Sequence, residues 1–448
     1  MMKNHATFCH VLQNASEYLT SNTLVNLTHG NYFVSEEIGA RITNVHNLTL
    51  IGSNMGSTVV NCSKQFGIFA LSTHFVISNL NFLNCTYTRL LPSTLSVGVT
   101  VIVKSSNVTL INTSFNSSTG SSIFAISSNL EFLGRTAFKE NHCFSSCGIY
   151  AEISNVAFHG VVVFQDNKCE EACSIFANRN TNISFHKSVL FEGNEAVLDG
   201  SGIYADYNCD IIFLDTVVFQ NNTCQFGCGI LALGNSNISF NSSAIFESNK
   251  AVNYGGGVMI THNSALKFKS SATFQSNQAA YGCAMYLHTD ENAVLFLNSA
   301  EINITTNYAS QSGGGIYIAS SSSVKGSLLR SPARSCFYHC MDEQDCPNFN
   351  FVDNKANVAG HMIYGDVHQC YIYSNDMNIS SILPIHNQSD IASDPTRVCF
   401  CVNAARNCGV KTQNKTVYPG ETFTIPVVVV GDLLGITTGT VFTVLPSC

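Results

Sequence analysis

The sequence has few charged residues and no tryptophan. Lys, Arg, Asp and Glu together make up 11 % of the 448 residues, against about a quarter in an average soluble domain. The net charge is −8 and no run of basic residues is present, which argues against a nucleic-acid partner and against binding to an anionic membrane face. Asn, Ser and Thr are abundant instead. We expect these uncharged polar residues to cover the surface.

Long apolar segments and helical patterns are also missing. The most apolar segment, 423–436, is interrupted by Pro426, Gly431 and Asp432, and a membrane-spanning helix needs roughly 18 uninterrupted apolar residues. We therefore expect no membrane insertion within this chain. The first six residues lack the apolar core of a signal peptide. No Gly-x-Ser-x-Gly elbow, phosphate-binding loop or His-Glu-x-x-His helix is present, and we expect no cofactor.

The chain is organised by a repeat whose clearest copy runs from Phe246 to Val258. A copy begins with Phe-x-x-Asn, followed two residues later by Ala or Cys. It ends in a turn containing Gly or Cys that leads into Ile, Val or Met. The phenylalanines recur every 26 to 28 residues between Phe138 and Phe274, and a fixed period of this size indicates a solenoid. The asparagines of the repeat are Asn141, Asn167, Asn194, Asn222, Asn249, Asn277, Asn307 and Asn354.

Within one copy the pattern is that of short strands separated by turns. Residues 237–240, 244–246 and 257–260 are rich in β-formers, and Asn, Ser and Gly separate them. Three short strands in about 27 residues have the size of one coil of a right-handed parallel β-helix. We predict an all-β, pectin-lyase-like solenoid with a short C-terminal β module.

Stacking of such coils at ~4.8 Å would align equivalent residues. The repeat asparagines would then form a hydrogen-bonded ladder, and the phenylalanines would form two interior columns. One column holds Phe138, Phe164, Phe191, Phe219, Phe246 and Phe274, and the other holds Phe132, Phe158, Phe185, Phe213, Phe240 and Phe268.

Phe-x-x-Asn followed by Gly-Gly-[Ala/Gly]-[Ile/Val] resembles the repeat of the polymorphic outer membrane proteins, a family of β-helical surface proteins. It is also similar to the β-helix ectodomains of uncharacterised invertebrate surface proteins. The resemblance spans roughly residues 50 to 390, with eight copies in register. It implies surface exposure and adhesion rather than catalysis.

Three regions follow from the limits of the repeat. We predict that residues 1–47 form an N-terminal cap, because the open apolar end of a solenoid must be covered. Residues 48–395 are predicted to form the β-helix. Residues 396–448 contain Cys399, Cys401 and Cys408 together with strand-like segments, and we predict a small, incomplete β module.

Nineteen cysteines predict disulfides and an oxidising compartment. Two turn positions hold cysteine together in Cys143 and Cys147, in Cys169 and Cys173, and in Cys224 and Cys228. Where the first position is Ala (196, 251 and 356), the second is Gly (200, 255 and 360). We predict bridges within these three turns and a bridge between coils from Cys62 to Cys85. Cys283, opposite Ala279, breaks the rule. Buried reduced thiols are the alternative.

Sixteen Asn-x-Ser/Thr sequons point to the same secretory setting. None of the eight ladder asparagines heads a sequon, so we expect an inward ladder and outward glycans. The general abundance of Asn, Ser and Thr is the alternative explanation. Candidate glycosylation sites include Asn107, Asn112, Asn182, Asn237, Asn241, Asn303, Asn378 and Asn414.

Candidate catalytic groups are few. Asp199, Asp206, Asp210 and Asp215 form the densest acidic group, and we interpret them as solvated turn residues rather than an acid–base pair. His159, His186, His262 and His288 are interpreted as scattered surface residues. The set Cys336, His339, Cys340 and Cys346 could bind zinc, although a disulfide-pinned loop explains it better.

The longest interruption of the repeat lies between Gly326 and Asn348. This insert carries Arg330, Arg334, Phe337 and Tyr338, residue types that are enriched at binding hot spots. It is a candidate recognition loop, with a bulge that binds nothing as the alternative. The sequence as a whole predicts a non-enzymatic, extracellular or cell-surface scaffold that recognises a protein or glycan ligand. A carbohydrate-active β-helix enzyme, a lyase or glycosidase, is the alternative, and it would need a groove with two acids beside a basic residue.

Overall fold

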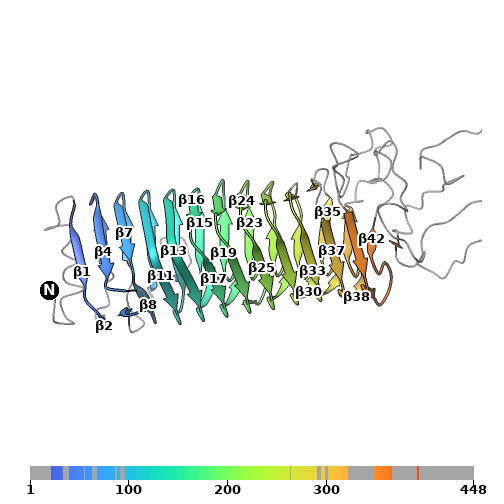
Figure 1. Ribbon diagram of the computed structural model, residues 1–448, viewed down its shortest axis with the longest axis horizontal. Helices are drawn as coiled ribbons and strands as arrows, with labels where there is room; N and C mark the ends of the chain where they lie inside the picture. Colours follow the sequence, from blue (N-terminus) through green and yellow to red (C-terminus); the bar gives the residue numbers. More distant parts are fainter. Residues whose placement is uncertain are drawn as a thin grey trace, which may run out of the picture.

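The computed structural model describes residues 22–33, 40–54, 56–62, 68–85, 88–90, 96–262, 264–289, 294–297, 301–320, 348–365 and 391–392. All regular structure in these residues is β-strand. The chain winds into an elongated solenoid in which the strands of successive coils lie side by side (Figure 1). The predicted fold class, an all-β parallel β-helix, is confirmed.

Within the described residues, the largest of the three sheets has 21 strands, which form two rows joined through β11 (Asn107–Asn116) and β13 (Asn129–Lys139). These two long strands run through both rows. The other strands of the first row are β1 (Leu24–Leu27), β4 (Leu48–Gly52), β7 (His74–Ser78), β16 (Asn155–Phe158), β20 (Asn182–Phe185), β24 (Asp210–Phe213), β28 (Asn237–Phe240), β32 (Ala265–Phe268) and β36 (Val294–Leu297). Those of the second row are β2 (Gly30–Phe33), β5 (Thr58–Asn61), β8 (Asn81–Leu83), β17 (Val162–Gln165), β21 (Val189–Glu192), β25 (Val217–Gln220), β29 (Ala244–Glu247), β33 (Ala272–Gln275), β37 (Glu301–Thr305) and β40 (Asn348–Val352).

Two further sheets belong to the solenoid, and the smaller one begins only with the coil that contains β13. The 8-stranded sheet contains β14 (His142–Ser145), β18 (Lys168–Glu171), β22 (Glu195–Ala196), β26 (Thr223–Phe226), β30 (Lys250–Tyr254), β34 (Gln278–Tyr281), β38 (Tyr308–Ser312) and β41 (Lys355–Ala356). The 14-stranded sheet contains β3 (Ala40–Thr43), β6 (Ile68–Leu71), β10 (Ser96–Lys104), β12 (Ser121–Ile126), β15 (Ile149–Glu152), β19 (Ile175–Asn178), β23 (Ile203–Asp206), β27 (Ile230–Ala232), β31 (Val258–Ile260), β35 (Met285–Thr289), β39 (Ile316–Ser320), β42 (Ile363–Gly365) and β43 (Ile391–Ala392), with β9 (Thr88–Leu90) antiparallel to β10.

Coiling begins before the predicted boundary at residue 48. Strands β1, β2 and β3 pair in parallel with β4, β5 and β6 of the next coil. The described part of the predicted cap is therefore itself a coil. The predicted module at 396–448 lies outside the described residues.

Two columns of stacked phenylalanines fill the interior. Consecutive rings from Phe138 to Phe274 stack with centroids 4.6–4.9 Å apart, and those from Phe132 to Phe268 stack at 4.4–5.0 Å. The columns meet edge to face, as in Phe213 and Phe219 at 6.1 Å, a favourable arrangement for aromatic quadrupoles. These rings are at most 1 % exposed, so burial of their apolar surface stabilises every coil.

The repeat asparagines lie in one buried column beside the phenylalanines. The side-chain amide of Asn222 donates to the Oδ1 of Asn249 (2.9 Å) and to the carbonyl of Phe191 (3.0 Å), and its backbone N–H also donates to the Oδ1 of Asn249 (3.1 Å). The same three bonds recur at each asparagine from Asn141 to Asn307. We name this column the buried amide ladder. It joins eight coils through otherwise unsatisfied turn groups.

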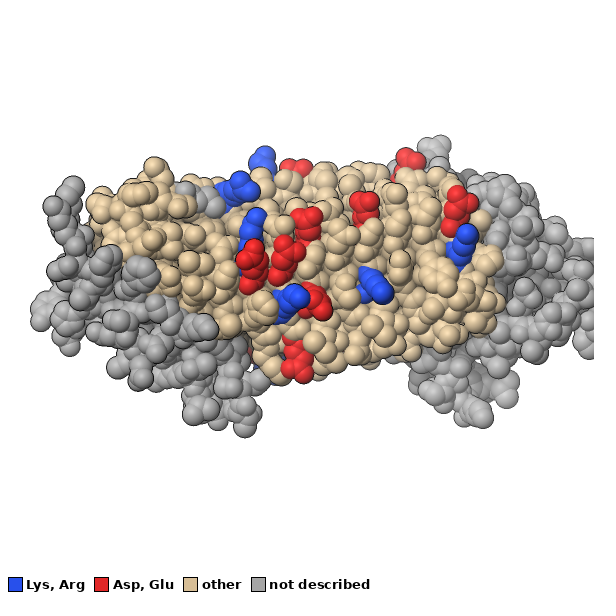
Figure 2. Space-filling view, turned by 90° about the horizontal axis from the view of Figure 1, so that it is seen from below, with Lys and Arg blue, Asp and Glu red and all other residues tan. Residues whose placement is uncertain are grey.

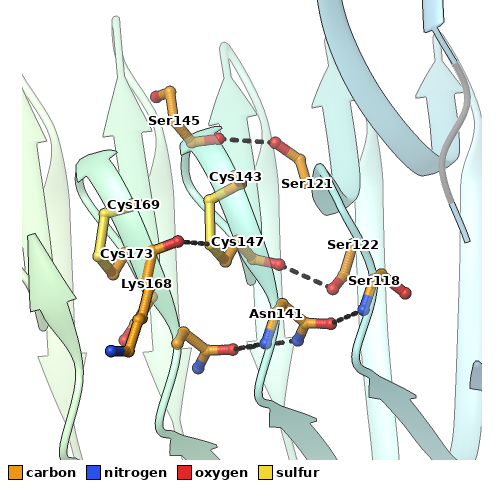
Figure 3. Close-up of a disulfide and its surroundings, with 12 residues drawn as sticks. Ser118, Ser121, Ser122, Asn141, Cys143, Ser145, Cys147, Lys168, Cys169 and Cys173 are labelled. Atoms are coloured by element: carbon orange, nitrogen blue, oxygen red, sulfur yellow. Dashed lines mark hydrogen bonds between the residues drawn. A yellow bond between two sulfur atoms is a disulfide. The ribbon is translucent and has the colours of Figure 1, made fainter. Parts of the chain in front are cut away.

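Two turn disulfides, Cys143–Cys147 and Cys169–Cys173, lie beside this ladder near Asn141 (Figure 3). The structure pairs Cys143 with Cys147, Cys169 with Cys173, Cys224 with Cys228, and Cys62 with Cys85. The first three bridges close turns with Cα–Cα distances of 5.2–5.3 Å, and the fourth joins two coils. Among the described cysteines, Cys209 and Cys283 are unbridged and buried.

The sequence places Gly200, Gly255 and Gly360 in the same column as the second cysteine of each disulfide turn. This prediction is wrong by one residue. The N–H of Ser174 donates to the carbonyl of Ser201, as the N–H of Gly148 does to Cys173, so Ser201 occupies the cysteine column. Gly200 lies one residue earlier, in a column that takes positive φ: 49° at Gly200 and 52° at Ala172. The turns of Ala196, Ala251 and Ala356 are one residue longer than the disulfide turns. The extra residue causes a shift of register in the strand pairing.

Replacement of Asn222 by Ala should remove the side-chain partners of Asn194, Asn249 and Phe191. Because buried polar groups would be left without partners, we expect Asn222→Ala to destabilise the protein by about 2–4 kcal/mol in chemical unfolding. Asn241→Ala is the control, since the Oδ1 of Asn241 has no hydrogen-bond partner, and it should cost less than about 0.5 kcal/mol. Equal losses would contradict the structural role of the ladder.

Cys283 is unpaired because alanine occupies its partner's position. Ala279 shares the column of Cys169 and Cys224, and its turn has the same length as the disulfide turns. We expect Ala279→Cys to form a fourth turn disulfide with Cys283, detected by peptide mapping of the unreduced protein. Ala309→Cys, in a coil without a turn cysteine, should keep a free thiol. A free thiol at both positions 279 and 283 would refute the assigned register.

Candidate functional site

A groove of about 850 Å³ crosses the outer face of the first row, from β7 to β32. Side chains alternate in and out along these strands, so that in β16 Asn155 and Ala157 face solvent while Val156 and Phe158 are buried. The groove therefore presents two columns of side chains. Both columns face solvent; we call the first the outer column and the one two residues later along each strand the inner column. The outer column holds His74, Asn107, Asn129, Asn155, Asn182, Asp210 and Asn237, and the inner column holds Thr109, Glu131, Ala157, Ser184, Ile212, Ser239 and Lys267.

The outer column forms a second, exposed amide ladder. The Nδ2 of Asn129 donates to the Oδ1 of Asn107, that of Asn155 to Asn129, and that of Asn182 to Asn155, each at 2.9 Å. After a break, Asn237 donates to the carboxylate of Asp210 at 2.9 Å. This ladder donates towards the preceding coil, whereas the buried ladder donates towards the following coil.

A column of buried hydroxyls fixes the backbone beside the exposed ladder. The residue before each groove asparagine is a serine or threonine that accepts a backbone N–H from the preceding coil. Ser128 donates its N–H to the Oγ of Ser154 (3.1 Å), and Ser154 to the Oγ1 of Thr181 (3.3 Å). The Ser154 hydroxyl in turn donates to the carbonyl of Glu152 (2.8 Å). These bonds hold the groove asparagines in register from coil to coil.

Cys209 occupies the hydroxyl column in the coil of Asp210. Its N–H donates to the Ser236 hydroxyl at 3.2 Å, and its thiol donates to the carbonyl of Asp206 at 3.1 Å. Burial raises the pKa of Cys209 to about 11, which keeps the thiol protonated and unreactive at neutral pH.

The exposed ladder was missed in the sequence, although a signal for it exists. In the phenylalanine column from Phe132 to Phe240, each phenylalanine is preceded by a Ser-Asn, Thr-Asn or Cys-Asp pair, with the Asn or Asp three residues before it. The predicted glycosylation sites Asn107, Asn182 and Asn237 belong to this ladder. Of the other predicted sites, Asn112 donates to Asn79 (3.2 Å) and Asn303 accepts from Asn350 (3.1 Å). Asn378 and Asn414 lie outside the described residues.

The charged groups that line the groove do not converge. Glu131 and Lys267 stand in one column but five coils apart, which is about 24 Å at ~4.8 Å per coil. Asp210 is three coils from Glu131, or about 14 Å. Glycosidase carboxylates are about 5–9.5 Å apart. The described groove thus holds two acids and a lysine without an acid–base pair.

The four aspartates of the predicted acidic group do not form one cluster: Asp206 and Asp210 flank the turn between β23 and β24, whereas Asp199 and Asp215 lie in other turns. Asp206 ends β23, Asp210 begins β24, and Asp215 accepts the N–H of Thr216. Asp199 stands apart in the turn after β22, where burial and then the neighbouring carboxylate of Glu171 raise its pKa. Glu171, which sequence reasoning did not single out, therefore joins Asp199 as a carboxylate pair outside the groove.

Two histidines border the groove together. The rings of His159 and His186 are tilted by 31° with their centroids 4.4 Å apart, and Nε2 of His186 lies 3.2 Å from the Oγ of Ser184. Desolvation, and then the neighbouring His159, lower the pKa of His186. The prediction that these histidines are scattered is therefore wrong for His159 and His186, although His159 is exposed and His186 half-buried at the surface, as predicted. No group of three or more His, Cys, Asp or Glu among the described residues could hold a metal ion.

The predicted recognition residues Arg330, Arg334, Phe337 and Tyr338 lie outside the described residues, as does the cluster from Cys336 to Cys346. In the part of the chain that is described, Lys, Arg, Asp and Glu are scattered in small groups of both signs over one face of the solenoid (Figure 2). The four disulfides indicate an oxidising environment. None of the described residues forms a helix long and apolar enough to cross a membrane.

Comparison with known proteins establishes neither a family nor a function. No family model matches the chain, and none of the curated proteins matches it. Among solved structures, it is similar to a mutant of AlyGC, an alginate lyase of the PL6 family, with a TM-score of 0.33 and 10 % sequence identity. The match covers 88 % of this chain and 53 % of the lyase, so this chain spans about half the length of the protein it matches.

Proposed function

We propose that this protein is a non-enzymatic recognition scaffold of the extracellular space or cell surface, and that its groove binds an uncharged, extended polysaccharide. The observation that carries the proposal is the pair of outward columns over the first row. Amides and hydroxyls predominate in them, and sugar hydroxyls both donate to and accept from such groups. The disulfides support an oxidising compartment.

The length and composition of the groove favour a polymer over a small ligand. From β7 to β32 it crosses seven coil steps, or about 34 Å. Each exposed amide keeps hydrogen-bonding capacity beyond its ladder bond, while Ala157 and Ile212 offer small apolar surfaces between the polar groups. A peptide would be expected to need deeper apolar pockets for anchor residues.

To test this function, the protein is produced by export to a bacterial periplasm, where disulfides form and N-glycans are not added. Binding is measured against neutral and acidic polysaccharides. We expect a neutral polymer to bind, and Asn129→Ala with Asn155→Ala to weaken binding by about tenfold, because two hydrogen-bonding amides are removed. Gln275→Ala, on the exposed end of β33, is the matched control and should bind normally.

Binding that is unaffected by the groove variants, or no binding of any polymer, would refute the groove proposal. The same incubations report on the enzyme alternative. Release of cleaved oligosaccharides that is lost in Asp199→Asn would replace recognition with catalysis at the Glu171–Asp199 pair.

A further inference from the structure

Three glycosylation sequons open directly into the groove. Asn107, Asn182 and Asn237 stand in its outer column, and the hydroxyl residues that complete the last two sequons, Ser184 and Ser239, stand in its inner column. Asn182 is exposed and Asn237 half-buried. A glycan on any of these three residues would grow into the groove.

The exposed ladder leaves one amide hydrogen free for modification. The Nδ2 of Asn155 donates to the preceding coil, and its Oδ1 accepts from the following coil. The hydrogen in its ladder bond is therefore the one anti to its carbonyl oxygen. A glycosylated asparagine is a secondary amide, and the trans form of such an amide keeps this same hydrogen. Asn182 and Asn237 donate to the preceding coil in the same way. Glycan attachment is therefore compatible with their ladder bonds.

The coil between the two sequons lies under both attachment points. Ile212 pairs with Ser184 on one side and with Ser239 on the other, each about 5 Å away. We propose that N-glycans on Asn182 and Asn237 cover the middle of the groove, so that glycosylation decides whether it can receive a polymer. This inference rests on the proposed function of the groove.

The chemistry needs a lipid-pyrophosphate-linked oligosaccharide as donor. The Nδ2 of asparagine attacks the anomeric carbon, and a C–N bond forms as the bond from that carbon to the pyrophosphate oxygen breaks. The lipid pyrophosphate leaves with the electron pair, and one amide proton passes to solvent. Each site therefore loses one N–H and keeps the other.

The test uses the full chain secreted from a eukaryotic host and a cysteine reporter, Ile212→Cys, in the groove. Ser184→Ala with Ser239→Ala removes both sequons while keeping both asparagines, and Ser184→Thr with Ser239→Thr preserves the sequons. Glycopeptide mapping reports occupancy, and the rate of maleimide labelling reports access. Gln275→Cys, on the exposed end of β33, controls for general reactivity, and protein without a reporter gives the background.

We expect glycans on both asparagines and labelling of Cys at 212 that is several-fold slower in the parent and threonine forms than in the alanine form. Labelling at 275 should be equal in all three. Unoccupied sequons, or occupied sequons with equal labelling at 212, would overturn the inference. Neither result depends on polysaccharide binding. The binding assays on the glycan-free periplasmic protein therefore test the proposed function separately.

Discussion

The hydrogen bond from one repeat asparagine to the next is the interaction on which the other features depend. From Asn167 onward, each buried Oδ1 accepts both the backbone N–H and the side-chain amide of the preceding asparagine, as Asn249 does from Asn222. A shift of one residue would break all of these bonds and would also turn phenylalanines out of the core. The ladder therefore sets the register, and the aromatic columns supply the largest fully buried side chains.

Because the interior fixes the register of the coils, the outward-facing side chains are aligned as well. Because strands alternate inward and outward positions, the coils that align Phe158 with Phe185 also align Asn155 with Asn182 and Ala157 with Ser184. The groove is thus a regular lattice of amides and hydroxyls rather than a pocket built from one loop. Such a lattice suits a ligand that is itself repetitive, and its sequons offer a way to cover it.

The sequence predicted the interior better than the surface, for physical reasons. Phe246 and Asn249 recur because a solenoid core accepts few alternatives at those positions. The register of Gly200 could not be predicted, since a turn one residue longer is recognised only from strand pairing. The pairing of Glu171 with Asp199 also depends on neighbouring coils. The Ser-Asn, Thr-Asn and Cys-Asp pairs before the phenylalanines could have indicated the exposed ladder. In the sequence alone, however, they look like any solvent-exposed polar residues.

Hydrogen exchange of the buried ladder tests this account most directly. The backbone amides of Asn141, Asn167, Asn194, Asn222, Asn249, Asn277 and Asn307 lie in turns, yet each donates to a buried side-chain oxygen of the next coil. We predict that they exchange as slowly as the amides of the flanking strands. Exchange as fast as that of exposed turn residues would contradict the claim that this ladder holds the coils together.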